Sequence, residues 1–422
     1  MEEIFNKSVS FLGLGYIGLP TAALVASKGI KVNGVDIKKE YVESINGKKF
    51  KSKEIGLEDL VKRVIEDKSF LASSEVGPSD VFVIAVPTPF KKNSFKPDIS
   101  FINRSAEMIA PHLKKDDLII LESTSPIGTT SNLSKFLSKM RPDLVFPTDP
   151  QELSDISIAY CPERVIPGNI LKELVSNDRV IGGITGRCAK KAKAFYKTFV
   201  SGDCFLTDSK TAEMVKLTEN SSRDVQIAFA NELSMICDKH DIDVFNLISL
   251  ANKHPRVDIL NPGPGVGGHC IAVDPWFLVL TNKDESRLIQ EARKVNLKKT
   301  EWIIKQINLK MEELLTENNE ESNHKISITF FGLTYKNDVD DIRESPSLEI
   351  AKRFSSRDGV KALVVDPNIH SLPKGCAGLK LVEIEKGIQS DMLVLLVNHK
   401  EFAVLDKETF HKKILIDAIG FF

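Results

Sequence analysis

Apolar residues fall in short runs that alternate along the chain with stretches of helical spacing. In the first half, strands are predicted at Ser8–Leu12, Lys31–Val35, Asp80–Val86 and Asp117–Leu121, and a helix from about Ile17 to Lys28. Strands that alternate with helices are typical of a parallel sheet covered on both faces. We therefore expect residues 1–207 to form a doubly wound α/β domain. Its further strands are predicted at Ile156–Tyr160, Arg179–Gly183 and Cys204–Thr207.

A long helix is predicted after this domain. It would begin at a cap formed by Asp208 or Ser209 and run to about Lys239, because no proline interrupts it and apolar residues recur at helical spacing. Two more helices are predicted, one at Val244–Asn252 and one from about Glu285 to Leu315. We expect residues 208–316 to form a central helical domain that joins two α/β domains and takes part in a dimer interface.

The α/β pattern begins again after a polar, acidic linker at Thr316–Lys325. Strands are predicted at Ile326–Phe331, Val360–Val365, Met392–Val397 and Ile414–Ile416, and a helix at Ser347–Phe354. Residues 317–422 are therefore expected to form a second doubly wound domain. Because no short-period repeat is visible, the two α/β halves are expected to be a loose pseudo-repeat at most.

Composition narrows the class of protein. The 422 residues are 42% hydrophobic and 27% charged, which is ordinary for a globular protein of two or three domains. Lys+Arg 57 balance Asp+Glu 58, and no basic run indicates nucleic-acid binding. Apolar runs such as Val81–Val86 are too short for a membrane span, and the acidic N-terminus is unlike a signal peptide. Six cysteines without paired spacing predict reduced thiols, no metal site and a cytoplasmic protein.

A glycine-rich turn follows the first predicted strand. Gly13-Leu-Gly-Tyr-Ile-Gly18 opens the first helix, and the second strand ends on Asp36. Alone, a G-x-G-x-x-G run is often only a turn, but this order of strand, turn, helix, strand and acid is the dinucleotide-binding fingerprint. Asp36 would repel a 2′-phosphate and so favours NAD over NADP, although Lys38 and Lys39 weaken that preference. The first domain is therefore predicted to be a Rossmann-like NAD-binding domain.

Polar residues also follow other strands and line the long helix. Thr88 and Thr124 stand after two predicted strands, where α/β sheets bind ligands, although threonine there also caps helices. Lys216, Asn220 and Arg223 share one face of the long helix, since they are spaced at i, i+4 and i+7. The alternative for this face is simple exposure to solvent.

A loop rich in glycine and proline contains Cys270. The run from Asn261 to Pro275 holds four glycines and three prolines, which exclude an ordinary helix or central strand. Such a loop can expose a thiol among backbone N–H groups, and Asp274 could reach the same space. The alternative is a surface turn with an incidental cysteine.

Taken together, these motifs resemble the UDP-glucose/GDP-mannose dehydrogenase family over nearly the whole chain. Enzymes of this family use NAD to oxidise a nucleotide sugar at C6 to a uronic acid. The resemblance rests on eight blocks in the family's order: Gly13–Pro20, Ala85–Phe90, Glu122–Pro126, Tyr160–Arg164, Ala212–Asn220, His254–Arg256, Gly263–Trp276 and Arg343–Pro346. It implies two Rossmann-like domains joined by a long central helix region.

Two features make the chain most similar to the family members that oxidise UDP-N-acetyl-D-mannosamine. Arg164 replaces a phenylalanine that is typical of UDP-glucose dehydrogenases, and those enzymes lack the run His269–Pro275. The resemblance thus implies oxidation of an N-acetylated hexosamine, for cell-surface polysaccharide synthesis. The second α/β half lacks a G-x-G-x-x-G run, so we expect it to bind the UDP-sugar rather than a second dinucleotide.

The resemblance also implies roles for individual residues. Oxidising an alcohol to an acid needs two NAD, and the intermediate aldehyde yields a second hydride only after a nucleophile adds to it. Cys270 is implied as that nucleophile and Lys216 as the proton donor and acceptor or oxyanion stabiliser. The residues implied to hold the attacking water are Asn220, Asp274, Thr124 and Glu163. Those implied to bind NAD are Gly13, Gly15, Tyr16, Ile17, Gly18, Asp36, Thr88, Thr124 and Arg343. Those implied to bind the substrate are Arg164, Val165, Lys216, Asn220, Arg223, His254, Arg256, Gly267, Tyr335 and Lys336.

Three alternatives stay open at this point. The first is a dehydrogenase of UDP-N-acetylglucosamine or UDP-glucose with the same mechanism. The second is a regulatory protein that binds a nucleotide sugar without turning it over, although such a protein would not need Cys270, Lys216, Asn220 and Asp274 together. The third is an epimerase that uses NAD transiently. A homodimer or higher homo-oligomer is expected in the family, where some contacts cross between subunits.

Overall fold

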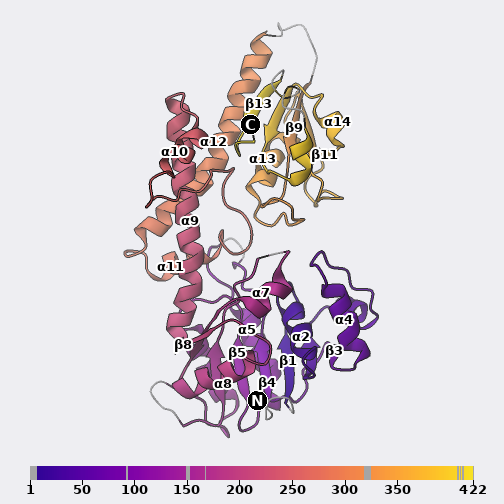
Figure 1. Ribbon diagram of the computed structural model, residues 1–422, viewed down its shortest axis with the longest axis vertical. Helices are drawn as coiled ribbons and strands as arrows, with labels where there is room; N and C mark the ends of the chain where they lie inside the picture. The colour runs from indigo at the N-terminus through magenta and orange to yellow at the C-terminus, as the bar shows by residue number, and fades with distance from the viewer. Residues whose placement is uncertain are drawn as a thin grey trace. The chain divides into compact units, whose positions relative to one another are not determined.

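The computed structural model describes residues 7–91, 94–148, 153–166, 168–317, 325–405, 408, 410 and 413–421. It divides into two compact units, Met1–Glu219 and Asn220–Phe422, coloured from indigo to yellow along the chain in Figure 1. The linker predicted at Thr316–Lys325 lies for the most part outside the described residues. No helix in the described part of the chain combines the length and apolar character that crossing a membrane requires.

The first unit is built on an eight-stranded sheet, counted over the described residues. Its order is β3-β2-β1-β4-β5-β6-β7-β8, and only the β6–β7 pairing is antiparallel. The strands are β1 (Ser8–Leu12), β2 (Lys31–Val35), β3 (Phe70–Ser73), β4 (Val81–Ile84), β5 (Leu118–Leu121), β6 (Ser157–Tyr160), β7 (Arg179–Gly183) and β8 (Cys204–Asp208). The strands β4, β5 and β6 are buried along their whole length, as expected where helices cover both faces.

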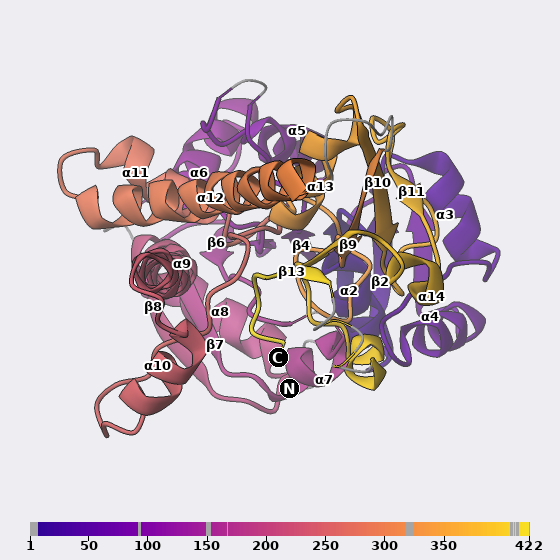
Figure 2. The same ribbon diagram turned by 90° about the horizontal axis from the view of Figure 1, so that it is seen from above.

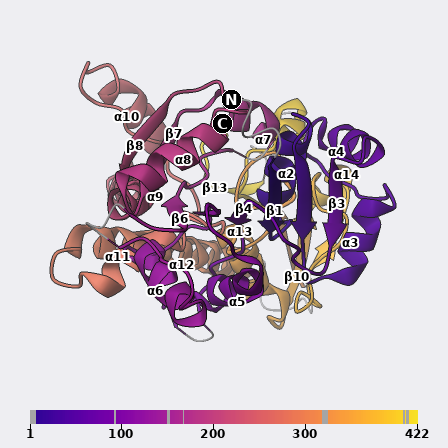
Figure 3. The same ribbon diagram turned by 90° about the horizontal axis from the view of Figure 1, so that it is seen from below.

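Helices cover both faces of this sheet. They are α2 (Gly18–Ala26), α3 (Lys39–Asn46), α4 (Leu57–Glu66), α5 (Ser100–Ile109) with η1 (Ala110–His112), α6 (Thr129–Met140), α7 (Ile170–Ser176) and α8 (Gly186–Tyr196). One buried cluster joins the sheet to α2, α4, α7 and α8, and a second joins its other face to α5 and α6. Figure 3 shows these two layers on opposite sides of the strands. This arrangement confirms the predicted doubly wound class.

After the first sheet come two long helices, α9 (Ser209–Lys239) and α12 (Arg287–Glu317), and two short ones, α10 (Val244–Ala251) and α11 (Asp274–Thr281). The boundary between the two units falls within α9, after Glu219. Helices α9, α10 and α12 match the predicted spans closely. Helix α11 was not predicted, because its sequence begins inside the Gly/Pro-rich loop.

The second unit holds a parallel sheet of five strands among the residues described. Its order is β11-β10-β9-β12-β13. The strands are β9 (Ile326–Phe331), β10 (Val360–Val365), β11 (Lys380–Leu381), β12 (Met392–Leu395) and β13 (Ile414–Asp417). Helices α12 and α13 (Pro346–Ser355) pack on one face, and α14 (Ile384–Gly387) with η2 (Lys400–Val404) on the other. Figure 2 shows α13 and α14 on opposite sides of β9 and β10.

The two sheets repeat one design more closely than the sequence suggested. The order β3-β2-β1-β4-β5 recurs as β11-β10-β9-β12-β13. Polar anchors recur as well. Asp36 Oδ2 accepts a hydrogen bond from the N–H of Leu14 (3.2 Å), and Asp366 Oδ2 accepts one from the N–H of Leu333 (2.7 Å). The pseudo-repeat expected between the two α/β halves therefore lies in the order of five strands and in this pair of aspartates, since the two sheets differ in their number of described strands.

Candidate active site

The glycines of the first turn form a cradle at the start of α2. A Cβ on Gly13, whose φ is +95°, would lie 2.7 Å from the Ala85 carbonyl oxygen, and one on Gly18 would lie 1.8 Å from the oxygen of Gly13. In contrast, nothing lies within 4 Å of a Cβ built on Gly15. Two glycines are thus required by close packing, while the third leaves room for a phosphate beside the helix N-terminus. Tyr16 is exposed and Ile17 half-buried at this turn.

Asp36 ends β2 and stabilises the same turn. Its Oδ2 accepts from the N–H of Leu14 (3.2 Å), and its Oδ1 accepts from the N–H of Lys38 (3.0 Å). The carboxylate is half-buried, so it stands at the end of the strand where the ribose of a dinucleotide is bound in this fold. These residues fit NAD.

Thr88 and Thr124 tie two neighbouring strand ends together. The hydroxyl of Thr88, after β4, donates to the backbone oxygen of Thr124, after β5, at 2.6 Å. Both threonines are half-buried. The structure therefore brings these two predicted residues together. Their hydrogen bond joins the loops that follow β4 and β5, and the Thr88 hydroxyl does not cap a helix.

The segment after β6 carries Glu163, Arg164 and Val165 close to α9. Arg164 forms an ion pair with Glu219 of α9, with 2.5 Å between Nη2 and Oε1. Burial raises the pKa of Glu163, against the lowering effect of backbone hydrogen bonding and of the Lys216 charge. Val165 packs on the first core cluster. Sequence reasoning gave no role to Glu219, although the residue lies within the block Ala212–Asn220.

In the second unit, Asn220 and Asp274 are hydrogen-bonded. The Asn220 side-chain amide donates to Asp274 Oδ2 at 2.5 Å, and Asp274 is 3% exposed. Asp274 is also the first residue of α11, and its N–H donates to the carbonyl oxygen of Cys270 (2.8 Å). Cys270 itself is half-buried, whereas the other five cysteines are buried. The thiol thus stands on the turn that leads into α11.

Buried polar side chains of α9 and α12 fasten the start of the cysteine loop. Asn231 Oδ1 accepts from the N–H of Gly263 (2.9 Å), and the Thr300 hydroxyl donates to the oxygen of Pro264 (2.8 Å). Asn231 in turn donates to Asn296 Oδ1 (2.9 Å). These positioning residues were missed, and their only signal was polar residues at inward positions of apolar helices.

The end of the loop packs on the segment that carries Tyr335 and Arg343. The N–H of Gly268 donates to the oxygen of Arg343 (3.0 Å), and a Cβ on Gly267 would meet the Cβ of Tyr335 at 2.7 Å. Burial is the main cause that raises the pKa of Tyr335, with contributions from the charges of Asp341 and Cys270. Hydrogen bonds to Asp341 are the main cause that raises the pKa of Arg343, and the charge of Cys270 adds to it. Tyr335 and Arg343 therefore lie near the thiol.

The remaining predicted substrate residues are on the surface. Arg223, His254, Arg256 and Lys336 are exposed, and Lys216 is half-buried. The N–H of Arg256 donates to His254 Nδ1 at 3.3 Å, which is a local turn contact. Lys216 and Asn220 lie one turn apart on α9, as the spacing predicted.

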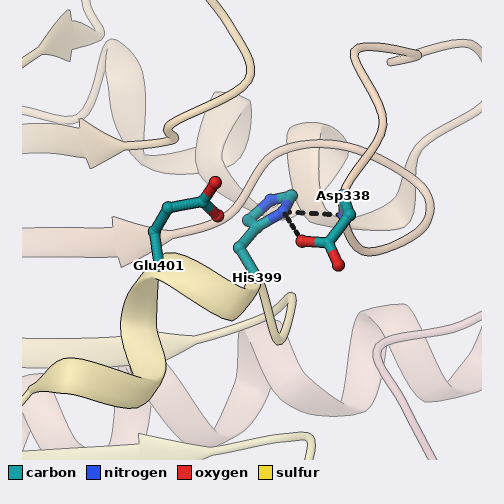
Figure 4. Close-up of side chains that lie close together, drawn as sticks. All are labelled: Asp338, His399 and Glu401. Carbon is teal, nitrogen blue, oxygen red and sulfur yellow. Dashed lines mark hydrogen bonds and ion pairs between the residues drawn. The ribbon is translucent and has the colours of Figure 1, made fainter. Parts of the chain in front are cut away.

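Asp338, His399 and Glu401 place potential metal-ligand atoms within 4.8 Å of one another (Figure 4). Yet His399 Nδ1 accepts from the N–H of Asp338 at 3.0 Å, so its lone pair is already engaged. The arrangement is that of a hydrogen-bonded histidine rather than a set of metal ligands.

Comparison with known proteins places these features in one family. Residues 7–200 match the NAD binding domain of the UDP-glucose/GDP-mannose dehydrogenase family, residues 210–298 its central domain and residues 329–422 its UDP binding domain.

Full-length relatives agree with these matches. The UDP-N-acetyl-D-mannosamine dehydrogenase of Escherichia coli (strain K12) is 48% identical over 415 residues, 98% of each chain. The NDP-N-acetyl-D-galactosaminuronic acid dehydrogenase of Ralstonia nicotianae is 47% identical over 99% of this chain and 97% of its own. The solved structure of UDP-D-ManNAc dehydrogenase from Pyrococcus horikoshii is 35% identical, covers 98% of this chain and 96% of its own, and has a TM-score of 0.86. The chain is therefore an NAD-dependent dehydrogenase that belongs to the UDP-glucose/GDP-mannose dehydrogenase family.

Proposed function

We propose that this chain oxidises UDP-N-acetyl-D-mannosamine at C6 to UDP-N-acetyl-D-mannosaminuronate, for cell-surface polysaccharide synthesis. The observation that carries the reaction type is the half-buried Cys270 on the turn that leads to Asp274, whose carboxylate is hydrogen-bonded to Asn220 of α9. The sugar rests on the likeness to relatives named for UDP-N-acetyl-D-mannosamine, at 48% identity over 98% of the chain.

NAD, when bound at the cradle of Gly13, Gly15 and Gly18, supplies the oxidant for both two-electron steps. In the first step, Lys216 would accept the proton that leaves the C6 hydroxyl, or stabilise the oxygen as it becomes a carbonyl. Its place one helical turn before Asn220 puts a cation and an amide on one face of α9. The product of this step is the C6 aldehyde.

Cys270 makes the second oxidation possible. Its thiolate adds to the aldehyde carbon, a C–S bond forms, and the carbonyl oxygen takes up a proton to give a thiohemiacetal. Loss of the C6 hydrogen as hydride, and of that proton, converts this group to a thioester. Water then cleaves the C–S bond, which releases the carboxylic acid and returns the thiol.

Asn220 and Asp274 would hold the water for that cleavage, with Thr124 and Glu163 as further contributors. A buried carboxylate that is already oriented by an amide can accept a proton from water as the water attacks. Burial raises the pKa of Glu163, so this carboxyl group holds a proton more readily than an exposed glutamate does.

Substrate binding is proposed for Arg164, Val165, Arg223, His254, Arg256, Gly267, Tyr335 and Lys336. The UDP group would belong to the C-terminal half, whose residues 329–422 match the UDP binding domain of the family. Arg343 would serve NAD, as the family pattern implies. We further propose three domains, 1–207, 208–316 and 317–422, in a cytoplasmic homodimer or higher homo-oligomer.

The test is a panel of UDP-sugars in which NADH is counted per sugar consumed. The panel contains UDP-N-acetyl-D-mannosamine, UDP-N-acetylglucosamine, UDP-N-acetylgalactosamine and UDP-glucose. We expect the highest kcat/KM with the mannosamine compound and two NADH for each sugar. A higher kcat/KM for another sugar would overturn the substrate assignment. Epimerisation without net NADH, or binding without turnover, would overturn the reaction.

A further inference from the structure

His399 is buried completely in the second unit, between β12 and η2. It is 0% exposed, and its ring packs edge-on against Phe402 with 5.4 Å between ring centroids. None of the functions described above uses this imidazole. Its two ring nitrogens nevertheless contact residues that lie far from it in the sequence. Nδ1 faces Asp338 (Figure 4), and Nε2 faces Thr334.

The hydrogen bonds of His399 define one neutral tautomer. Nδ1 accepts from the backbone N–H of Asp338 (3.0 Å) and faces the side-chain amide of Asn368 (3.1 Å). Nδ1 is therefore the acceptor nitrogen, and Nε2 carries the proton. Nε2 lies 3.3 Å from the hydroxyl of Thr334 and 3.4 Å from Oδ2 of Asp366.

This imidazole begins a directed chain of hydrogen bonds into the segment Thr334–Asp338. Nε2–H faces the Thr334 oxygen, and the Thr334 hydroxyl donates to the backbone oxygen of Lys336 at 2.7 Å. At the other end of the segment, Asp338 Oδ1 accepts from the N–H of Lys400 at 3.0 Å. Both ends of the segment that carries Tyr335 and Lys336 are thus fastened to His399 or its neighbour.

The internal repeat shows what is particular about this position. Asp36 and Asp366 occupy equivalent places, and each accepts a backbone N–H from the turn after the first strand of its sheet. Asp36 is half-buried, whereas Asp366 is 6% exposed with His399 against it. Burial acts to raise the pKa of Asp366, but hydrogen bonds from His399 and the backbone hold it below its usual value. The second carboxylate is therefore engaged by the protein's own imidazole.

We propose that His399 is a positioning residue for the UDP group of the substrate, because it fixes the segment Thr334–Asp338 and so the placement of Tyr335 and Lys336. The proposal rests on the proposed function, in which these two residues bind the UDP-sugar. It predicts that loss of the imidazole weakens nucleotide binding and leaves the NAD cradle unaffected.

The experiment measures binding of UDP and of NADH separately, by titration calorimetry on the full chain. The variants are His399→Ala and His399→Asn, and the matched control is His370→Ala, an exposed histidine of the same half. His399→Ala should raise the Kd of UDP about tenfold or more, the effect of losing one buried hydrogen-bonding group. His399→Asn should recover part of this loss, because its Oδ1 can accept the Asp338 N–H in place of Nδ1. NADH binding should stay unchanged in all three.

In turnover assays the same loss should raise KM for the UDP-sugar and leave kcat at saturation nearly unchanged. Unchanged UDP affinity in folded His399→Ala would overturn the proposal, as would an equal loss of UDP and NADH affinity. If His399→Ala does not fold, the same two affinities are measured for His399→Asn. Unchanged UDP affinity, or an equal loss of UDP and NADH affinity, in that variant would overturn the proposal. A wild-type chain that binds no UDP would overturn the proposed function too, whereas a different preferred sugar would leave the UDP test valid.

Discussion

The side chains of Asn220 and Asp274 are joined by a hydrogen bond although they are 54 residues apart in the chain. Asp274 is 3% exposed, and a buried carboxylate is costly unless it is hydrogen-bonded. The bond fixes the first residue of α11, four positions after Cys270, to helix α9. Stability and chemistry therefore depend on one contact, and mutations can separate the two.

Exchanging the two residues is expected to restore stability without restoring activity. Asp274→Asn alone removes the carboxylate, and Asn220→Asp alone places two carboxylates together, so each should destabilise the fold by about 1–3 kcal/mol. The double variant Asn220→Asp/Asp274→Asn reforms an amide–carboxylate pair with the charge moved to α9. Its melting temperature should return towards the wild-type value, while kcat stays low, because position 274 no longer accepts a proton from water.

Full activity of the double variant would contradict this assignment, since it would show that only the contact matters. If the decrease in melting temperature of the double variant equals the sum of the decreases in the two single variants, the two residues do not interact. Both quantities come from one preparation, by thermal unfolding and by steady-state NADH formation.

Thiol labelling should distinguish Cys270 from the other cysteines. Cys270 is half-buried and the other five are buried, so iodoacetamide should modify it first. Mass spectrometry of the folded enzyme is expected to show one fast adduct, and activity should fall in step with it. Cys270→Ala should lower acid formation by roughly a thousandfold or more and retain NADH binding. The control is Cys237→Ala, and faster labelling at another cysteine would contradict the assignment.

The sequence predicted those parts of the fold that depend on local pattern. Strands β1 and β2, the glycine turn before α2 and the long α9 all follow from apolar spacing and from glycine. Strand β3 was missed because it has only four residues, Phe70–Ser73, and its outward-facing Leu71 is apolar, so the alternation of apolar and polar residues that marks a strand is weak. Helix α11 was missed because proline and glycine precede it, although Pro275 is well suited to the first turn of a helix.

Long-range polar contacts could not be predicted from one sequence. Asn231 and Thr300 hold the cysteine loop from two different helices, and a polar residue at an inward helix position does not show which loop it will contact. The same is true of His399, which acts on a segment about 60 positions earlier, as its separation of 61 residues from Asp338 shows. Residue types at motif positions were predictable, whereas the residues that orient them became visible only with the structure.

Two glycines of the cysteine loop should differ in their tolerance of alanine. A Cβ on Gly267 would lie 2.6 Å from the backbone oxygen of Glu344 and 2.7 Å from the Cβ of Tyr335, and backbone cannot yield as a flexible side chain can. On Gly263 a Cβ would meet nothing within 4 Å. Gly267→Ala should therefore cost about 1–3 kcal/mol of stability and raise KM for the UDP-sugar. Gly263→Ala is the control and should change neither; equal effects on both would refute the packing argument.

Glu122 should make the stability of the first unit depend on pH. The carboxyl group is 4% exposed, and burial raises its pKa to about 7, against the opposing charge of Arg179 and a 2.6 Å hydrogen bond from the Tyr196 hydroxyl. An unfolded glutamate has a pKa of 4.5. Between these values the folded state binds more protons at Glu122 than the unfolded state, so the contribution of Glu122 to stability falls as pH rises from about 4.5 to about 7.

Glu122→Gln should remove this part of the pH dependence. The substitution keeps an oxygen for the Tyr196 hydroxyl but cannot ionise. At about 1.4 kcal/mol per pKa unit, the variant should exceed the wild type in stability by up to about 3 kcal/mol at pH 8, with the difference shrinking towards pH 5. Urea unfolding at pH 5, 6, 7 and 8 measures it, with the exposed Glu107→Gln as control. If wild type and Glu122→Gln lose stability equally across this range, Glu122 is ionised in the folded protein throughout, and Arg179 stabilises its charge more strongly than burial opposes it.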